Sequence, residues 1–348
     1  MTKSLGLWMF RLTVACTLLL ALVLPVRAQD VLRILTWPGY ADADLVKAFE
    51  KQFNARVEVT FVSTDDVLRE RLGANQGRDF DVVAANTAEI SSFIDRKLLL
   101  PLRPENIPNT RRQLPRFREV QSIGGIVRKE GVYAIPYTFA EMGLIYDRKQ
   151  VRQAPTSMAA MWDPQYQGRV LAFDGSTHAF SIASLLLHGK PFHIEDRQFK
   201  AVVAHLIALR RNVLTFYTLP EESVELFRQN GAALLFANYG SQQVKLLRDA
   251  GVDVGYVIPD EGALAWLDCW AVSRGVRNQR LAESWINYTL EPQVSGALTK
   301  RQGLSNTIEA SALTRDTDKL IWLEPAEDDK RRASLWARII SGDAPGRF

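Results

Sequence analysis

The sequence is poor in the residues that build disulfide scaffolds and metal sites. It contains two cysteines and four histidines among 348 residues. None of the histidines lies in a His-Glu-x-x-His or Cys-x-x-Cys setting, the spacings typical of transition-metal sites. We therefore expect no metal, no other cofactor and no internal disulfide, and a fold that is stabilised by its hydrophobic core alone.

Motifs of nucleotide-dependent and hydrolytic enzymes are also missing. The chain has no phosphate-binding loop, no G-x-G-x-x-G after its first predicted strand and no G-x-S-x-G nucleophile elbow. Cys269 lies in an apolar run, where a thiol is expected to be inert. These absences remove the positive case for catalysis, and we predict that the protein is not an enzyme.

The N-terminal apolar run is too short to span a membrane. It covers 13 residues, 12–24, and follows Lys3 and Arg11. A bilayer span needs about 20 apolar residues. Because a small-x-small sequence follows at 26–28, we interpret residues 1–28 as a cleaved signal peptide and expect a periplasmic protein. The alternative is an uncleaved anchor.

Without this leader, the chain has almost no excess of positive charge. Removing its three basic residues from the 43 of the chain leaves 40 basic against 39 acidic residues, a net charge of +1. No basic run with interleaved aromatic residues remains, so nucleic acid is not an expected partner.

Alternating strands and helices dominate the remaining chain. Strand-like runs at 31–37, 56–62 and 79–85 alternate with helical patterns at 43–53 and 65–75. A βαβαβ series indicates a parallel sheet with helical crossovers. From Val132 onward the pattern is less regular, with two short strands expected around Pro136 and long helices at about 178–188 and 196–211. We therefore predict two α/β lobes.

One carboxylate interrupts an apolar run. Asp268 lies in ALAWLDCWAV, and strand alternation places it on the same face as Trp266 and Trp270. A buried ionised carboxylate is costly unless it is paired, and a cation over an indole face gains about 0.5–2 kcal/mol. The pattern favours an ammonium ligand. The alternative is a core aspartate that caps a turn or pairs with an arginine such as Arg274.

A second group of candidates follows the predicted parallel strands. Trp37 and Tyr40 follow the first strand, and Asn86 and Thr87 follow the third. Ligands bind beyond the carboxyl ends of strands in open parallel sheets, so these residues are expected at one edge. Trp37 and Tyr40 as plain packing residues remain an alternative.

Several segments together resemble the bacterial periplasmic spermidine/putrescine-binding proteins, the solute receptors of polyamine ABC importers. The resemblance covers nearly all of the chain after the leader. The segments that carry it are ILTWPGY, DFDVVAANTAEI, YAIPYTFAEMGLIYD, MWDPQYQGRV and EGALAWLDCWAV, of which the last two are the most specific.

The resemblance implies a type II periplasmic-binding-protein fold. This fold is α/β, with two lobes that are each a mainly parallel sheet flanked by helices, and a hinged cleft between them. Lobe one is expected to hold 29–135 and 262–305, and lobe two 136–261 and 306–348. The implied function is capture of a polyamine such as putrescine or spermidine, or of a smaller amine, by a monomer that delivers it to an inner-membrane ABC permease.

The family's ligand site carries over only in part. Trp37, Tyr40, Trp266 and Asp268 match its aromatic and acidic positions, whereas other positions depart from it. His178 stands at a carboxylate position and Asn238 at a tryptophan position. The expected ligand-binding residues are Trp37, Tyr40, Asn86, Thr87, Asp174, His178, Asn238, Trp266 and Asp268.

Because of these departures from the family, the residue that would bind the second end of the ligand is not determined. Each buried ammonium of a diamine needs its own negative group, and Asp174, Glu141 or Asp65 are the candidates for that second group. Without one, the ligand is expected to have one cationic end and a neutral or anionic other end, and an amino-alkyl zwitterion such as an aminophosphonate is the alternative of this kind. A sensory module that presents its ligand to a membrane receptor is a further alternative.

Overall fold

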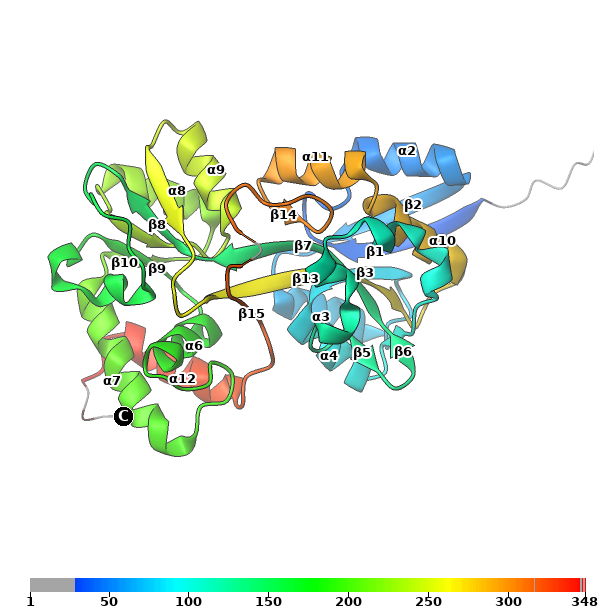
Figure 1. The fold of residues 1–348 in the computed structure, drawn as a ribbon. Coiled ribbons are helices and arrows are strands. Elements are labelled where there is room, and N and C mark those ends of the chain that lie inside the picture. Colours follow the sequence, from blue (N-terminus) through cyan, green and yellow to red (C-terminus); the bar gives the residue numbers. More distant parts are fainter. Residues whose placement is uncertain (1–28, 316, 345, 347) are drawn as a thin grey trace, which may run out of the picture.

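Two α/β lobes lie side by side in the computed structural model, which describes residues 29–315, 317–344, 346 and 348 (Figure 1). The predicted signal peptide lies outside the described residues. Two long strands, β7 (Ala134–Met142) and β13 (Ala263–Ser273), run between the lobes. Among the described residues, no helix is long and apolar enough to cross a membrane.

Lobe one is built on a sheet of eight strands within the described residues, in the order β14-β7-β13-β3-β1-β2, with β4 and β15 also pairing with β13. The strands β1, β2 and β3 are parallel, as the βαβαβ pattern predicts, whereas β13 is antiparallel to β3 and β7. The sheet is therefore more mixed than expected. Its other strands are β1 (Asp30–Thr36), β2 (Ala55–Phe61), β3 (Val82–Asn86), β4 (Leu99–Leu100), β14 (Ser305–Asn306) and β15 (Leu320–Trp322).

Lobe two is built on a second mixed sheet. Within the described residues it has five strands in the order β10-β9-β11-β8-β12, in which β8 is antiparallel to both of its neighbours. A short hairpin, β5 (Val127–Arg128) and β6 (Gly131–Val132), stands apart from both sheets. The strands of lobe two are β8 (Leu144–Asp147), β9 (Val170–Phe173), β10 (Thr215–Tyr217), β11 (Leu234–Phe236) and β12 (Val254–Val257).

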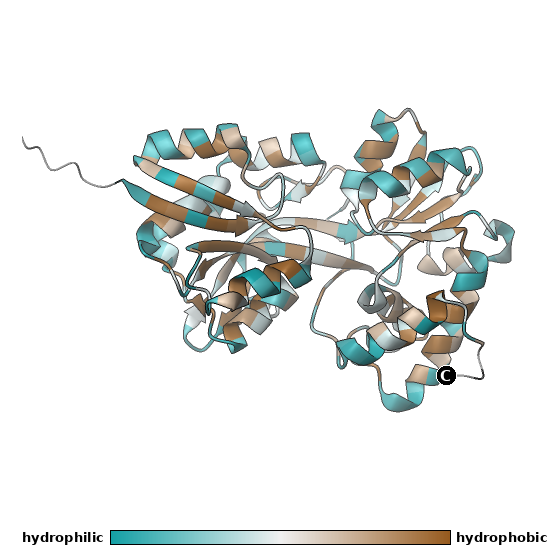
Figure 2. Ribbon diagram, turned by 180° about the vertical axis from the view of Figure 1, so that it is seen from behind, coloured by the Kyte–Doolittle hydropathy of each residue, from teal (hydrophilic) through white to brown (hydrophobic). Residues whose placement is uncertain are grey.

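Helices cover both faces of each sheet. In lobe one, α2, α10 and α11 pack on one face and α3 and α4 on the other. In lobe two, α6, α7 and α12 cover one face and α8 and α9 the other. Apolar residues gather on the strands and on the helix faces turned toward them (Figure 2). The helices are α2 (Ala43–Phe53), α3 (Asp65–Ala74), α4 (Thr87–Asp95), α5 (Pro115–Arg118), α6 (Ser176–Leu186), α7 (Asp196–Asn212), α8 (Pro220–Gln229), α9 (Ser241–Asp249), α10 (Gln279–Thr289), α11 (Pro292–Gln302) and α12 (Asp329–Ile340), with short 3-10 turns η1 (Pro104–Asn106), η2 (Pro108–Arg112), η3 (Val120–Ser122), η4 (Met158–Trp162) and η5 (Pro164–Tyr166).

The strand β7 is continuous through Pro136, where the sequence predicts two short strands. Proline lacks an amide hydrogen and is tolerated inside a sheet mainly at a bulge. The register of β7 and β13 shifts at this point, because Asp268 pairs with Thr138 whereas Cys269 pairs with Pro136. Tyr137 is the extra residue, and the bulge lets one strand cross from the first lobe toward the second.

The side chains of β13 alternate as the sequence predicts. Trp270 and Val272 belong to the core beneath α2 and α10, whereas Leu267 and Cys269 belong to the core beneath α3 and α4. Cys269 is fully buried, and burial raises the pKa of its thiol well above the usual value. This confirms that Cys269 lies in the core, as predicted.

The helix α12 is anchored to lobe two by a buried arginine. Arg332 is 0% exposed and donates to both carboxylate oxygens of Glu327, at 2.8 and 2.5 Å. It also donates to the hydroxyl of Ser181 at 3.0 Å and to the carbonyl of Pro191 at 2.9 Å. A buried cation with this many partners fixes the packing of its helix, because any replacement leaves several buried acceptors unpaired.

Replacing Arg332 should destabilise the protein much more than replacing its neighbour. We expect Arg332→Met to lower the free energy of unfolding by about 3 kcal/mol, since it leaves Glu327 without its partner. Arg331→Met is the control, because Arg331 pairs with Asp196 on the surface and should cost about 1 kcal/mol. Urea unfolding measures both. Equal losses in the two variants would contradict the anchoring role of Arg332.

Candidate functional site

The candidate site is built around a buried carboxyl in the middle of β13. Asp268 is 8% exposed, and its Oδ2 accepts a hydrogen bond of 2.7 Å from the hydroxyl of Tyr40. Within the described residues it has no ion pair, and Arg274 instead donates to the carbonyl of Lys97. The acid is thus hydrogen bonded but is not neutralised by a cation of the chain.

Burial dominates the electrostatics of this acid. Desolvation raises the pKa of Asp268 to about 7, while the hydrogen bond from Tyr40 lowers it and the charge of Asp65 raises it. Burial and the nearby Asp268 raise the pKa of Tyr40 well above its usual value, so Tyr40 remains a donor. A cation arriving beside Asp268 would favour the ionised form.

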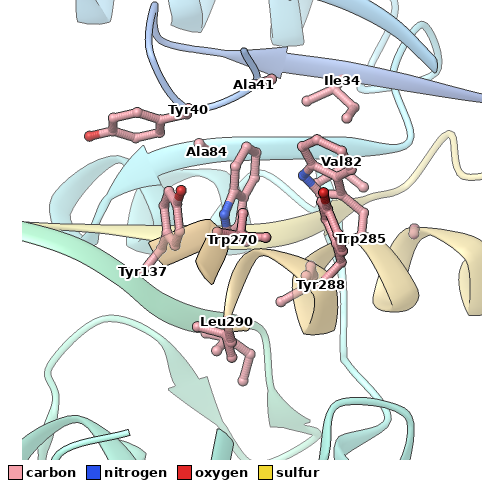
Figure 3. Close-up of a cluster of buried hydrophobic side chains, with 14 of the residues drawn as sticks. Ile34, Tyr40, Ala41, Val82, Ala84, Tyr137, Trp270, Trp285, Tyr288 and Leu290 are labelled. Carbon is pink, nitrogen blue, oxygen red and sulfur yellow. The ribbon is translucent and has the colours of Figure 1, made fainter. Parts of the chain in front are cut away.

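A tight turn after β1 brings Tyr40 to Asp268. The amide of Tyr40 donates to the carbonyl of Trp37 at 3.3 Å, and Gly39 adopts a φ of +88° that favours glycine. The ring of Tyr40 packs edge-on against Tyr137 and Trp270, with centroids at 5.5 and 6.3 Å. Tyr40 lies at the end of this aromatic cluster (Figure 3), which therefore fixes the direction of its hydroxyl.

Two tryptophans are candidates for the walls of the site. Trp37 follows β1 and is partly buried against both cores of lobe one, and its indole Nε1 has no hydrogen-bond partner among the described residues. Trp266 packs against the cores of both lobes, and its Nε1 donates to the carbonyl of Asn238 at 3.2 Å. Trp266 therefore lies where the lobes meet.

The two residues after β3 have different roles. Asn86 lies opposite Asp268 in the pairing of β3 with β13, caps α4 by accepting from the amide of Glu89, and donates to Asp65 Oδ1 at 3.3 Å. Thr87 is buried, and its hydroxyl donates to the carbonyl of Leu323 at 2.9 Å. The structure thus brings Asn86 next to the acid and uses Thr87 to hold the C-terminal segment.

Lobe two contributes neutral groups to this region. Asn238 follows β11 and is 6% exposed, and its side-chain Oδ1 has no hydrogen-bond partner. Tyr239 comes next, packs edge-on against Phe173 at 6.1 Å and donates to the carbonyl of Thr218. Asp65 contributes to raising the pKa of Tyr239, after burial and the charge of Glu221. The sequence reasoning missed Tyr239, although it is the neighbour of the predicted Asn238, three residues after the end of β11.

Asp174 and His178 are occupied within lobe two. Asp174 Oδ1 accepts from the indole of Trp336 on α12 at 2.7 Å. His178 packs edge-on against Phe173 at 5.3 Å, and burial lowers its pKa to about 4, so it is neutral. Within the described residues, no hydrogen bond joins either side chain to Asp268 or Asn86.

Glu141 lies on the wrong face to join Asp268. It pairs across the strands with Ala265, whose side chain alternates with that of Trp266. Both of its carboxyl oxygens are buried without a hydrogen-bond partner, and burial raises the pKa of Glu141 to about 8. Glu141 is therefore a buried acid with a raised pKa on the opposite side of the sheet.

Metal chemistry has no support in the described part of the chain. Within it, no group of three or more histidine, cysteine, aspartate or glutamate side chains could hold a metal ion. The arrangement is suited to binding: a desolvated carboxyl, a fixed hydroxyl, indole walls and uncharged polar groups around one position.

Comparisons with known proteins identify the family of the chain. Residues 44–324 match the family described as bacterial extracellular solute-binding protein. Spermidine/putrescine-binding periplasmic protein 1 of Haemophilus influenzae is 24% identical over 322 residues, which cover 91% of this chain and 86% of that protein. The putrescine-binding periplasmic protein PotF of Escherichia coli is 24% identical over 349 residues, covering 90% of this chain and 92% of PotF.

Solved structures confirm the fold. The spermidine/putrescine ABC transporter substrate-binding protein PotD from Streptococcus pneumoniae superposes with a TM-score of 0.74 at 21% identity, covering 89% of this chain and 98% of that one. The predicted type II periplasmic-binding fold is therefore confirmed. The family comprises substrate-binding proteins, which confirms the prediction that the chain is not an enzyme.

Removing the charge of Asp268 should stabilise the ligand-free protein. Its pKa is raised from 3.8 to about 7 on folding, so the folded state binds the proton more tightly, and wild-type stability falls as pH rises from about 4 to 7. We expect Asp268→Asn to raise the melting temperature at pH 8 by roughly 5 °C and to have little effect at pH 4.

The exposed Asp260 provides the matched control. Asp260→Asn removes the same charge at the surface and should leave the melting temperature within about 1 °C at both pH values. Asp268→Asn melting below wild type at pH 8 would show that the ionised carboxyl is structurally satisfied, and our assignment would then be wrong.

Proposed function

The chain belongs to the family of bacterial extracellular solute-binding proteins, and we propose that it captures a polyamine or a smaller cationic amine in the periplasm and delivers it to an inner-membrane ABC permease. Residues 1–28 act in this proposal as the signal peptide that directs export. The protein functions as a monomer, and its partners are the amine and the permease.

The observation that carries this proposal is the unpaired state of Asp268. A buried carboxyl with a single hydrogen bond and no cation costs stability. Tyr40 Oη occupies one carboxylate oxygen, Oδ2, and no described residue donates to the other. An ammonium group supplies both the charge and the donors that Oδ1 lacks, and a charge-assisted hydrogen bond of this kind is short and strong.

The surrounding aromatic residues select a cation over other donors. Trp266 lies two residues before the acid on the same face of β13, and Trp37 follows β1. An ammonium gains energy over an indole face when water is excluded. The alkyl part of an amine buries apolar area against the same rings. A neutral sugar or an anion would gain neither the charge pairing nor the cation–π contact.

Lobe closure completes the site in this proposal. Trp266 already joins the cores of both lobes and donates to Asn238 in lobe two. The strands β7 and β13 are continuous across the gap, so bending within them changes the separation of the lobes as in hinged binding proteins. Closure excludes water around Asp268 and strengthens its attraction for a cation.

The ligands in the relatives' names support an amine ligand. The matched proteins of Haemophilus influenzae and Escherichia coli are named for binding spermidine and putrescine, or putrescine alone. The two alternatives from the sequence, an amino-alkyl zwitterion and a sensory module, are not favoured by these comparisons.

Removal of the carboxylate should abolish amine binding. We expect wild-type protein to bind putrescine or spermidine in isothermal titration calorimetry, and Asp268→Asn to lose at least about 100-fold in affinity, because a buried ammonium loses its counter-charge. Asp260→Asn should bind as wild type does. Unchanged binding by Asp268→Asn would show that the amine binds elsewhere.

Amine affinity should fall in acid. The pKa of Asp268 is about 7 in the ligand-free protein, and protonation removes the charge that the ammonium needs. We therefore expect affinity to drop by up to about tenfold per pH unit below pH 7, since alkylammonium groups remain charged there. Calorimetry at pH 8, 7, 6 and 5 measures this. An affinity that stays constant over this range would contradict the assigned titration of Asp268.

A further inference from the structure

Two of the three candidate carboxyls for the second end of a diamine are less suited to that role than Asp65. Asp174 is bonded to Trp336, and Glu141 lies on the face opposite Asp268. Asp65 is the remaining candidate, and it lies on lobe one near Asp268 itself.

The topology of lobe one brings Asp65 to the edge that bears the candidate site. Asp65 is the first residue of α3, which begins after β2 with Thr64 as its cap, its hydroxyl accepting from the amide of Val67. The strands β1, β2 and β3 are parallel, so their carboxyl ends meet at one edge. Trp37, Asp65 and Asn86 follow those three strands.

Asn86 connects the two carboxyls. Its Nδ2 donates to Asp65 Oδ1 at 3.3 Å, and its backbone pairs with Asp268 across β3 and β13. Neighbouring strands are about 4.8 Å apart. The two acids are therefore separated by one asparagine side chain, and the charge of Asp65 reaches far enough to raise the pKa of Asp268.

Asp65 has no cation of its own among the described residues. The nearby Arg69 is bonded to Glu89, at 2.9 and 2.8 Å, and to Asp66. Burial and the charge of Glu89 raise the pKa of Asp65 to about 6, although Arg69 lowers it. The region therefore holds more acids than the single arginine can compensate.

Two other residues carry buried polar atoms without partners. Asn238 Oδ1, on a residue that is 6% exposed, and Trp37 Nε1 have no hydrogen-bond partner among the described residues. Asn238 is held beside Trp266 by the indole hydrogen bond, at the junction of the lobes. An acceptor of this kind is suited to a ligand N–H that enters between the lobes.

We infer that Asp65 and Asp268 together bind the two ammonium ends of a short α,ω-diamine, with Asn86 placed between them. This inference rests on the proposed function, because it assigns the second charge of the same site. Both charges of the ligand are then recognised by lobe one. Lobe two adds the uncharged Asn238 and Tyr239 as it closes.

Comparison of a diamine with a monoamine tests the assignment. The probes are butane-1,4-diamine and butan-1-amine, titrated calorimetrically into wild type, Asp65→Asn and the control Asp66→Asn, whose side chain is 89% exposed. We expect Asp65→Asn to lose at least about tenfold in diamine affinity and to keep its monoamine affinity within about twofold. Asp66→Asn should change neither value.

A second variant guards against a folding effect at the start of α3. Asp65→Glu retains the charge and should keep a preference for the diamine over the monoamine, which Asp65→Asn loses. Circular dichroism of each variant checks that α3 is formed.

The possible failures are distinct. If wild type binds the diamine and Asp65→Asn binds it equally well, or loses both amines to the same degree, the role of Asp65 is wrong while the amine-binding function stands. If wild type binds neither amine, the proposed function itself is overturned, and the inference with it.

Discussion

The hydrogen bond from Tyr40 to Asp268 is the interaction on which the account of this protein depends. It is a single donor to a buried carboxyl, and within the described residues no cation accompanies it. Asp81, another acid of lobe one, is paired with a cation instead. That acid is fully buried too, but Arg33 donates to both of its oxygens and the amide of Arg277 adds a further hydrogen bond. A carboxyl paired in this way stabilises the fold, whereas Asp268 has one hydrogen bond and no cation among the described residues.

The rest of lobe one holds this unpaired acid in place. The strand β13 lies between β3 and β7, so the backbone of Asp268 is fixed on both sides. The turn after β1 and the ring contacts with Tyr137 and Trp270 fix Tyr40. Lobe two offers no comparable free carboxyl among the predicted site residues, because Asp174 accepts a hydrogen bond from Trp336 and Asn238 is uncharged. This asymmetry supports the proposal that lobe one recognises charge and that lobe two encloses the ligand.

Much of this arrangement could be predicted from local patterns. The alternation of β13 put Asp268 beside Trp266, and the βαβαβ series put Trp37 and Asn86 at one edge. Long-range contacts could not be read in this way. Asp174 is bonded to a tryptophan 162 positions later in the chain, and no local pattern predicts that pairing. The face on which Glu141 lies depends on a bulge next to Pro136, which shifts the alternation of β7. The sequence alone gave no reason to prefer Asp65 over Asp174 or Glu141 as the carboxyl for a second ammonium group.

A crystal structure of the protein with a bound diamine would test the central claim most directly. We predict an ammonium nitrogen within about 3 Å of Asp268 Oδ1, with the hydrogen bond from Tyr40 to Oδ2 retained and the indole of Trp266 against the alkyl chain. A complex in which the diamine lies away from Asp268, or in which that carboxyl instead contacts an arginine of the chain, would contradict it.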